Sequence, residues 1–244
     1  MPTGHRTTLV TAILCFAAGL VLASFSDLAD FLPELLRGGL ITLQVTAGGA
    51  VLAVVAAFTA ALSRLYGPRP VRWLAAAYVE VFRGTSALVQ LFWLFFVLPH
   101  FGLTLSPMVV GIAALGLNVG AYGAEVVRGA IGSVVRGQWE ATVALNLTRA
   151  QALRRIILPQ AFVAMIPPWG NLFIELLKAS SLVSLITLSD LAFKAQQLNQ
   201  NTLRTAEVFS TVLLMYLALS VLITVAMHAL ETRAARGLRR GRVG

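Results

Sequence analysis

Residues 140–159 read EATVALNLTRAQALRRIILP, a polar and basic stretch in a chain that is otherwise strongly apolar. The run from Glu140 favours a helix, and Asn146 interrupts it. Asn is the least costly residue after Gly in the left-handed region, so a tight turn at Asn146 is expected. Thr148 is a candidate N-cap for a second short helix, which we expect to stop at Pro159. The stretch therefore predicts an amphipathic helical loop outside the lipid, built to dock on another molecule.

The rest of the composition is that of an integral membrane protein. Hydrophobic residues make up 58% of the chain and charged residues only 12%, far from the average of a soluble domain. The 244 residues leave room for about five or six spanning helices of roughly 20 residues each. We therefore expect an all-α, polytopic transmembrane helical bundle with no space for a soluble catalytic domain.

Several kinds of site are absent from the sequence. Without a Gly-Lys dipeptide there is no phosphate-binding loop, so this chain does not hydrolyse ATP itself. The lone Cys15 offers neither a disulfide nor a thiolate metal site, and the three histidines lack ligands at metal spacing. We expect no metal, no cofactor and no catalytic site.

Six apolar runs are candidate membrane helices. The first, 9–25, remains open between a cleaved signal peptide and an additional helix, and we favour the helix. A separate amphipathic stretch, 73–83, is expected to lie along the interface. In one of the six runs, Gly116 and Gly120 have the G-x-x-x-G spacing of close helix packing. The six runs are residues 9–25, 38–63, 86–105 (with a break at Pro99), 108–124, 161–188 and 208–230.

The basic residues indicate one orientation. If both termini are cytoplasmic, the outside connections hold only Arg37, Lys194 and Arg204 of the 19 basic residues. Nearly all the others fall in cytoplasmic connections and the tail, as the positive-inside rule requires. The net charge of +9 thus reflects the orientation of the chain in the membrane and does not indicate a nucleic-acid partner. Residues 140–159 fall in the cytoplasm.

Several blocks resemble the permease subunits of ABC importers, in the polar-amino-acid (His/Gln/Arg-type) branch. They are YVEVFRGTSALVQLFWLFFVLP from Tyr78, NVGAYGAEVVRGAIGSVVRGQWEA from Asn118, PPWGNLFIELLKASSLVSLI from Pro167, and the 140–159 loop itself. In this family the loop couples the permease to its ATPase. The positions that match the coupling motif are Glu140, Ala141, Thr142, Asn146, Ile156, Leu158 and Pro159. Thr142 stands where the family has Ala, and Asn146 where it has Gly.

The resemblance implies a five-helix type I importer core at 38–230, preceded by an extra helix and extracytoplasmic loop at 1–37 and followed by a basic cytoplasmic tail at 231–244. It also implies a bacterial inner-membrane location and a set of partners: ABC ATPase subunits, a second permease subunit that is homologous or identical, and an extracytoplasmic solute-binding protein. Residues 182–202, LVSLITLSDLAFKAQQLNQNT, are similar to ectoine and hydroxyectoine permeases. A general polar amino acid is the second candidate substrate.

A different class of protein, an ion-gradient-driven secondary transporter of amino acids, stays open, although no internal repeat supports it. A scaffold that transports nothing is a third possibility.

Polar residues inside the apolar runs are the candidates for a substrate path, because each is costly in lipid. Glu175 and Lys178 stand three apart, and they either neutralise each other or line a path for a zwitterion together with neighbouring hydroxyls. Glu125 and Arg128 are read as a gate or a structural pair. The candidates that contact substrate, each with helix–helix hydrogen bonding as the alternative, are Gln90, Asn118, Tyr122, Glu175, Lys178, Ser180, Ser181 and Ser184.

Overall fold

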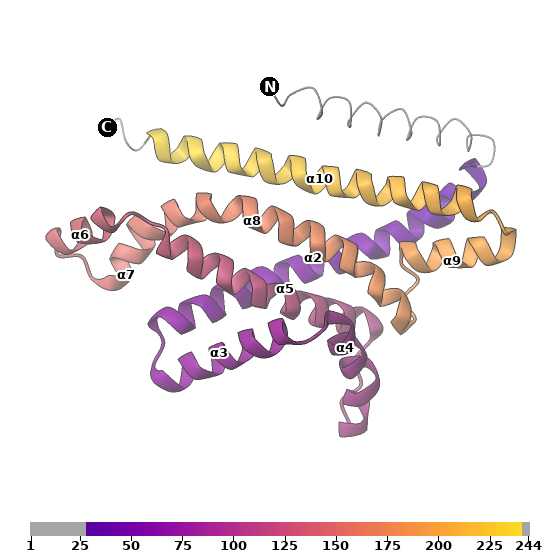
Figure 1. Ribbon diagram of the computed structural model, residues 1–244, viewed down its shortest axis with the longest axis horizontal. Helices are drawn as coiled ribbons and strands as arrows, with labels where there is room; N and C mark the ends of the chain where they lie inside the picture. Colours follow the sequence, from indigo (N-terminus) through magenta and orange to yellow (C-terminus); the bar gives the residue numbers. More distant parts are fainter. Residues whose placement is uncertain (1–27, 241–244) are drawn as a thin grey trace.

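The computed structural model describes residues 28–240, and within that range it contains helices and no strands. Figure 1 shows the long helices α8 and α10 side by side and α2 running obliquely to them, with α6 and α7 at one end of the bundle and α9 at the other. The α-helices are α2 (Leu28–Tyr66), α3 (Arg69–Gly84), α4 (Ala87–Phe92), α5 (Pro107–Gly132), α6 (Arg136–Ala144), α7 (Arg149–Ala152), α8 (Leu158–Ala179), α9 (Leu191–Thr202) and α10 (Thr205–Arg240). Short π- and 3-10 segments are η1 (Trp93–Val97), η2 (Leu98–Phe101), η3 (Leu153–Ile157) and η4 (Ser180–Ile186).

Four helices of the described part are long and apolar enough to cross a membrane, and a bent pair makes a fifth. The all-α, polytopic class is therefore confirmed. The apolar run 9–25 and Cys15 lie outside the described residues.

Helices α2 and α10 each extend about ten residues beyond their apolar runs, and α5 continues to Gly132, eight residues past its run. α2 begins at Leu28, ten residues before the expected start at Gly38, so the expected boundary at residue 37 lies inside a helix. α10 continues to Arg240 rather than ending near Leu230. In both cases the added residues carry charges that interrupt the apolar run, and they include good helix formers such as Leu, Ala and Arg. Hydropathy marks the part of a helix that lies in lipid and leaves its ends undetermined.

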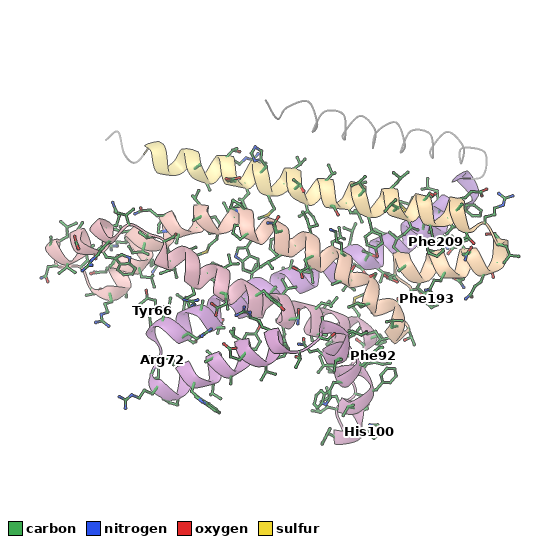
Figure 2. All side chains as sticks on the ribbon, in the orientation of Figure 1. Tyr66, Arg72, Phe92, His100, Phe193 and Phe209 are labelled. Atoms are coloured by element: carbon green, nitrogen blue, oxygen red, sulfur yellow. The ribbon has the colours of Figure 1, made fainter. Side chains whose placement is uncertain are left out.

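The expected span at 86–105 forms a bent pair of helices with α3, which contains residues 73–83. Residues 73–83, expected to lie along the interface, belong to α3, which packs against α2 and α5 with Val79 fully buried. The chain then bends by 107° into the segment Ala87–Phe101, which projects away from the bundle and carries Phe92 and His100 in Figure 2. The amphipathic pattern of α3 thus gives it one side that packs on the bundle, while Trp73, Leu74 and Val81 remain exposed.

A seam of small residues joins α2 to α5. A Cβ atom at Gly116 would lie 3.0 Å from the carbonyl oxygen of Gly49, and one at Gly120 would lie 3.1 Å from that of Ala53. Tyr78 of α3 reaches over the same seam and donates a hydrogen bond of 2.7 Å to the carbonyl oxygen of Leu117. Close packing at the G-x-x-x-G pair was predicted and is confirmed.

Pro159 does not end a helix, contrary to expectation. The chain is helical from Arg149 through Ala179, and η3 is a π-helical segment directly before the proline. There the amide of Leu158 bonds to the carbonyl of Leu153, five residues back. The wider π-turn accommodates a residue that has no amide hydrogen and whose ring would clash in a regular α-turn. The same solution occurs at η1, where Leu98 bonds to Trp93 just before Pro99.

Candidate functional site: an exposed knuckle and a polar row

Residues 135–152, here called the knuckle, form a fixed turn between α6 and α7. Asn146 has φ 51°, the left-handed conformation predicted for it. The amide of Asn146 donates to the carbonyl of Val143 at 2.9 Å, and the amide of Leu147 donates to the carbonyl of Thr142 at 3.0 Å. This pair of bonds is a Schellman motif, which satisfies the last carbonyls of α6.

The start of α7 is held by a capping box. Thr148 accepts a hydrogen bond from the amide of Gln151 through its hydroxyl, and the Gln151 side chain in turn accepts one from the amide of Thr148. The predicted N-cap is thus confirmed. With both helix ends satisfied, the knuckle keeps its shape without any contact from a partner.

The knuckle presents apolar side chains away from the bundle. Val143 is 77% exposed and Leu145 is 67% exposed, although both residues lie between two apolar spans and not within one. Glu140 is also exposed and pairs with Arg136 at 3.2 Å. Exposed valine and leucine therefore lie together at the tip of a polar loop.

The base of the knuckle is tied to the bundle. Thr142 is buried and donates to the carbonyl oxygen of Trp139, while Gln160 of α8 donates to the side chain of Gln138 of α6. Ile156 and Leu158 pack against the main core, whereas Ala141 and Pro159 are exposed. The coupling-motif residues therefore divide into those that face outward and those that connect the loop to α8.

A groove of about 440 Å³ lies between the knuckle and the end of α2. Its walls include Trp139, Glu140 and Arg149 from the knuckle and Tyr66 from α2. Figure 2 shows Tyr66 at the end of α2 on the same side of the molecule as α6 and α7. The groove is suited to receive a side chain from a docked partner.

A second feature is a row of polar side chains along α8 and η4. Glu175 and Lys178 are exposed on α8, and no ion pair or hydrogen bond joins them among the described residues. The predicted local pair is therefore not formed. Ser181, Ser184 and Thr187 continue at spacings of three residues, and η4 is a 3-10 helix, in which residues three apart lie directly above one another. The two serines donate to backbone carbonyls and keep their lone pairs for a ligand.

Ser180 does not belong to this row. It is fully buried, and its hydroxyl donates to the carbonyl oxygen of Leu177. It lies in a buried polar cluster with Thr42, Asp190 and Tyr216, which the sequence did not reveal. Asp190 caps α9 by accepting from the amide of Phe193, while its second carboxylate oxygen has no partner among the described residues. Burial raises the pKa of Asp190 to about 6.

Asp190→Asn is expected to raise the melting temperature of the protein at pH 8 and to change it little at pH 4. Because the folded-state pKa exceeds the unfolded value, the protonated carboxyl contributes stability below about pH 4 that is lost as pH rises through about 6, by about 3 kcal/mol. Asn keeps the N-cap but carries no charge to desolvate. Melting curves of the detergent-solubilised protein from pH 4 to 8 measure this. A variant less stable than the wild type at pH 8 would contradict it.

Gln90 and Asn118 stabilise the break between α3 and α4. Asn118 donates to the carbonyl oxygen of Phe82 at 3.0 Å and to the side chain of Gln90 at 3.2 Å. Gln90 donates to Phe82 and to the hydroxyl of Thr85. These bonds satisfy carbonyls that the broken helix leaves free. Tyr122, four residues after Asn118, is partly exposed and instead contacts Arg83, through its ring and by donating to the Arg83 carbonyl oxygen.

Glu125 forms a cluster of ion pairs at the end of α5 nearest the knuckle. The predicted pair with Arg128 is present at 2.6 Å, and Arg64 of α2 donates to the other carboxylate oxygen. Arg83 of α3 lies 3.9 Å away. One carboxylate thus joins three helices. The Arg64 contact, 61 residues apart in sequence, carries no local sequence signal.

No group of three or more metal-ligating side chains occurs among residues 28–240. His228 approaches Glu231 at 3.6 Å on α10, and His100 forms a hydrogen bond of 3.0 Å with the carbonyl oxygen of Phe96 on its own segment.

The comparisons with known proteins agree with this architecture. Residues 49–236 match a family described as "Binding-protein-dependent transport system inner membrane component". A probable amino-acid ABC transporter permease protein of Sinorhizobium fredii is 45% identical over 86% of this chain and 91% of its own length. The L-cystine transport system permease protein TcyB of Bacillus subtilis is 38% identical, over 85% and 89%. A crystal structure of an amino acid ABC transporter with histidines superposes with a TM-score of 0.79 at 32% identity, covering 85% of this chain and 97% of that one.

Proposed function

Because the chain belongs to the family of inner-membrane components of binding-protein-dependent transport systems, we propose that it moves a zwitterionic amino acid or amino-acid-like solute into the cytoplasm. It is a permease subunit of an amino-acid ABC importer, and the solute passes along the α8 row. The observation that carries this proposal is the exposure of Glu175 and Lys178 on a membrane-length helix. Lipid cannot solvate two charged side chains, so another protein surface or a water-filled path must face them.

A second permease subunit, identical or homologous, supplies that surface. The row then lines a passage between two chains, with a carboxylate, an ammonium and serine lone pairs within reach of one small molecule. A zwitterion offers the complementary charges. Gln90, Asn118 and Tyr122 contribute from the α3–α4 break beside this passage, and Ser180 supports it from behind.

Ectoine or hydroxyectoine is the substrate we favour. Both are cyclic zwitterions derived from amino acids, and the segment 182–202, which resembles their permeases, contains Ser184 and Thr187 of the row. A general polar amino acid is the runner-up, in line with the L-cystine transport named for the B. subtilis relative.

ATP hydrolysis belongs to separate ATPase subunits, which dock on the knuckle from the cytoplasm. Val143, Leu145 and Glu140 form the outward surface, and the adjacent groove receives an ATPase side chain. Closure of the ATPase dimer moves the knuckles, and the continuous helix from Arg149 to Ala179 passes this motion into the spans as a rigid-body rotation. Both termini are then cytoplasmic.

Uptake of labelled ectoine into proteoliposomes, in competition with cystine, glutamine and arginine, tests the substrate. Preferred uptake of a competitor would identify that amino acid, and not ectoine, as the substrate.

Lys178→Met is expected to raise the half-saturating solute concentration about tenfold, because the substrate carboxylate loses its charged partner. Ectoine uptake unchanged by Lys178→Met would show that the row does not line the substrate path.

The alternative class, an ion-gradient-driven carrier, would lose uptake when a protonophore is added while ATP is preserved.

A further inference from the structure

At the end of the molecule opposite the knuckle, α9 forms a short polar platform (Figure 1). Its inner side is fixed: Leu191 and Ala195 are fully buried against a cluster that includes Leu35 and Val208. Lys194 adds an ion pair of 2.9 Å to Glu34 of α2. Figure 2 shows Phe193 and Phe209 at this end, on α9 and α10. The platform is therefore held to two spanning helices.

The outer side of α9 is made of carboxamides. Gln196, Gln197, Gln200 and Asn201 are all exposed. Gln197 accepts a hydrogen bond of 3.1 Å from Lys194. Carboxamides are costly in hydrocarbon, so this side faces water or a polar partner and not lipid.

Leu203 is the exception on this polar surface. It is 84% exposed, more than any other large hydrophobic side chain in the described part of the chain, and it has φ 58°. The left-handed region is unfavourable for leucine, by roughly 1–2 kcal/mol. An exposed apolar side chain is thus held on a strained backbone, and such strain is typical of ligand clamps and recognition sites.

Hydrogen bonds fix the turn that presents Leu203. The amide of Leu203 donates to the carbonyl of Asn199 at 2.8 Å, and the hydroxyl of Thr205 donates to the side chain of Asn199 at 2.7 Å. The amide of Arg204 donates to the hydroxyl of Thr202. Leu203 is therefore pre-organised, which lowers the entropy cost of binding.

We propose that Leu203, framed by the carboxamides of α9, is the anchor on which the extracytoplasmic solute-binding protein docks. The assignment rests on the proposed function, which places the knuckle in the cytoplasm and α9 outside. The family is binding-protein-dependent, and a soluble partner from the outside reaches this end of the bundle. One apolar anchor inside a polar rim is the usual arrangement of a transient protein interface.

Leu203→Asn tests the proposal, because Asn tolerates the left-handed region and removes only the apolar side chain. Complete wild-type and variant importers are reconstituted, and uptake is measured against the concentration of the purified binding protein that supports wild-type uptake. The half-saturating concentration of that binding protein is expected to rise at least about fivefold. The maximal rate at saturation and the ATPase rate without binding protein stay within about twofold of wild type, which a merely misfolded variant would not achieve.

Leu103→Asn is the matched control, since Leu103 is a second leucine that is 60% exposed, in the connection before α5. It should leave the half-saturating concentration unchanged. An unchanged value for Leu203→Asn, or an equal rise in both variants, would overturn the assignment. If the wild-type importer shows no binding-protein-dependent uptake at all, the proposed function fails and not the choice of Leu203.

Discussion

Asn146→Val is expected to abolish substrate uptake while the chain still inserts into the membrane. Asn146 has φ 51°, and its amide closes the Schellman turn between α6 and α7. A β-branched residue in this conformation adds strain of about 2 kcal/mol, which corresponds to about a 30-fold fall in the population of the turn. Loss of the turn displaces Val143 and Leu145, the exposed residues of the docking surface. Uptake into proteoliposomes, with equal amounts of reconstituted wild-type and variant protein, measures the effect.

Asn146→Gly is the control, because Gly adopts the same conformation without cost, and it should transport as well as the wild type. Glu140→Lys tests the same surface without altering the turn: it reverses an exposed charge beside the groove, and uptake should again fall to background. In both defective variants the ATPase should no longer co-purify with the permease. A variant that loses uptake but retains a stably bound ATPase would show that the ATPase does not dock on the knuckle.

The sequence was sufficient where a feature depends on neighbouring residues. The left-handed Asn146, the cap at Thr148 and the close contact at Gly116 and Gly120 each follow from the chemistry of a residue and its immediate surroundings. The pair of Glu125 with Arg128 belongs to this group, since i,i+3 positions adjoin on any helix.

The sequence was insufficient where helix type or tertiary contact decides the outcome. Ser180 and Ser181 are adjacent in an apolar run and point in directions about 100–120° apart in either type of helix. Tertiary packing decides which of the two is buried, and it is Ser180, while Ser181 lies in the polar row. Pro159 looks like a helix end, but a π-turn accommodates it within a longer helix. The buried carboxyl of Asp190 depends on packing against Thr42, whose hydroxyl accepts a hydrogen bond from Leu191, 149 residues away.

Gly120→Leu is expected to prevent assembly of the bundle. A Cβ atom at this position would lie 2.9 Å from the hydroxyl of Tyr78, 3.0 Å from Cβ of Ala56 and 3.1 Å from the carbonyl oxygen of Ala53. The last contact is backbone, so α2 would have to move away from α5 along the seam. Without a hydrophobic effect between helices in lipid, this close packing is the main source of their association. Overpacking of even one or two methylenes typically costs about 1–3 kcal/mol, and a complete leucine side chain exceeds that range.

Gly129→Leu, on the same helix, separates steric damage from the simple loss of a glycine. A Cβ atom there meets nothing within 4 Å, and replacing a helical Gly gains about 1 kcal/mol of helix propensity. Size-exclusion chromatography in detergent should give a monodisperse peak for Gly129→Leu and a yield at least about fivefold lower for Gly120→Leu. The displacement would also disrupt the hydrogen bond from Tyr78 to Leu117, so Tyr78→Phe should reproduce a small part of the loss. Normal yield and normal uptake from Gly120→Leu would mean that α2 and α5 are not held together by this seam.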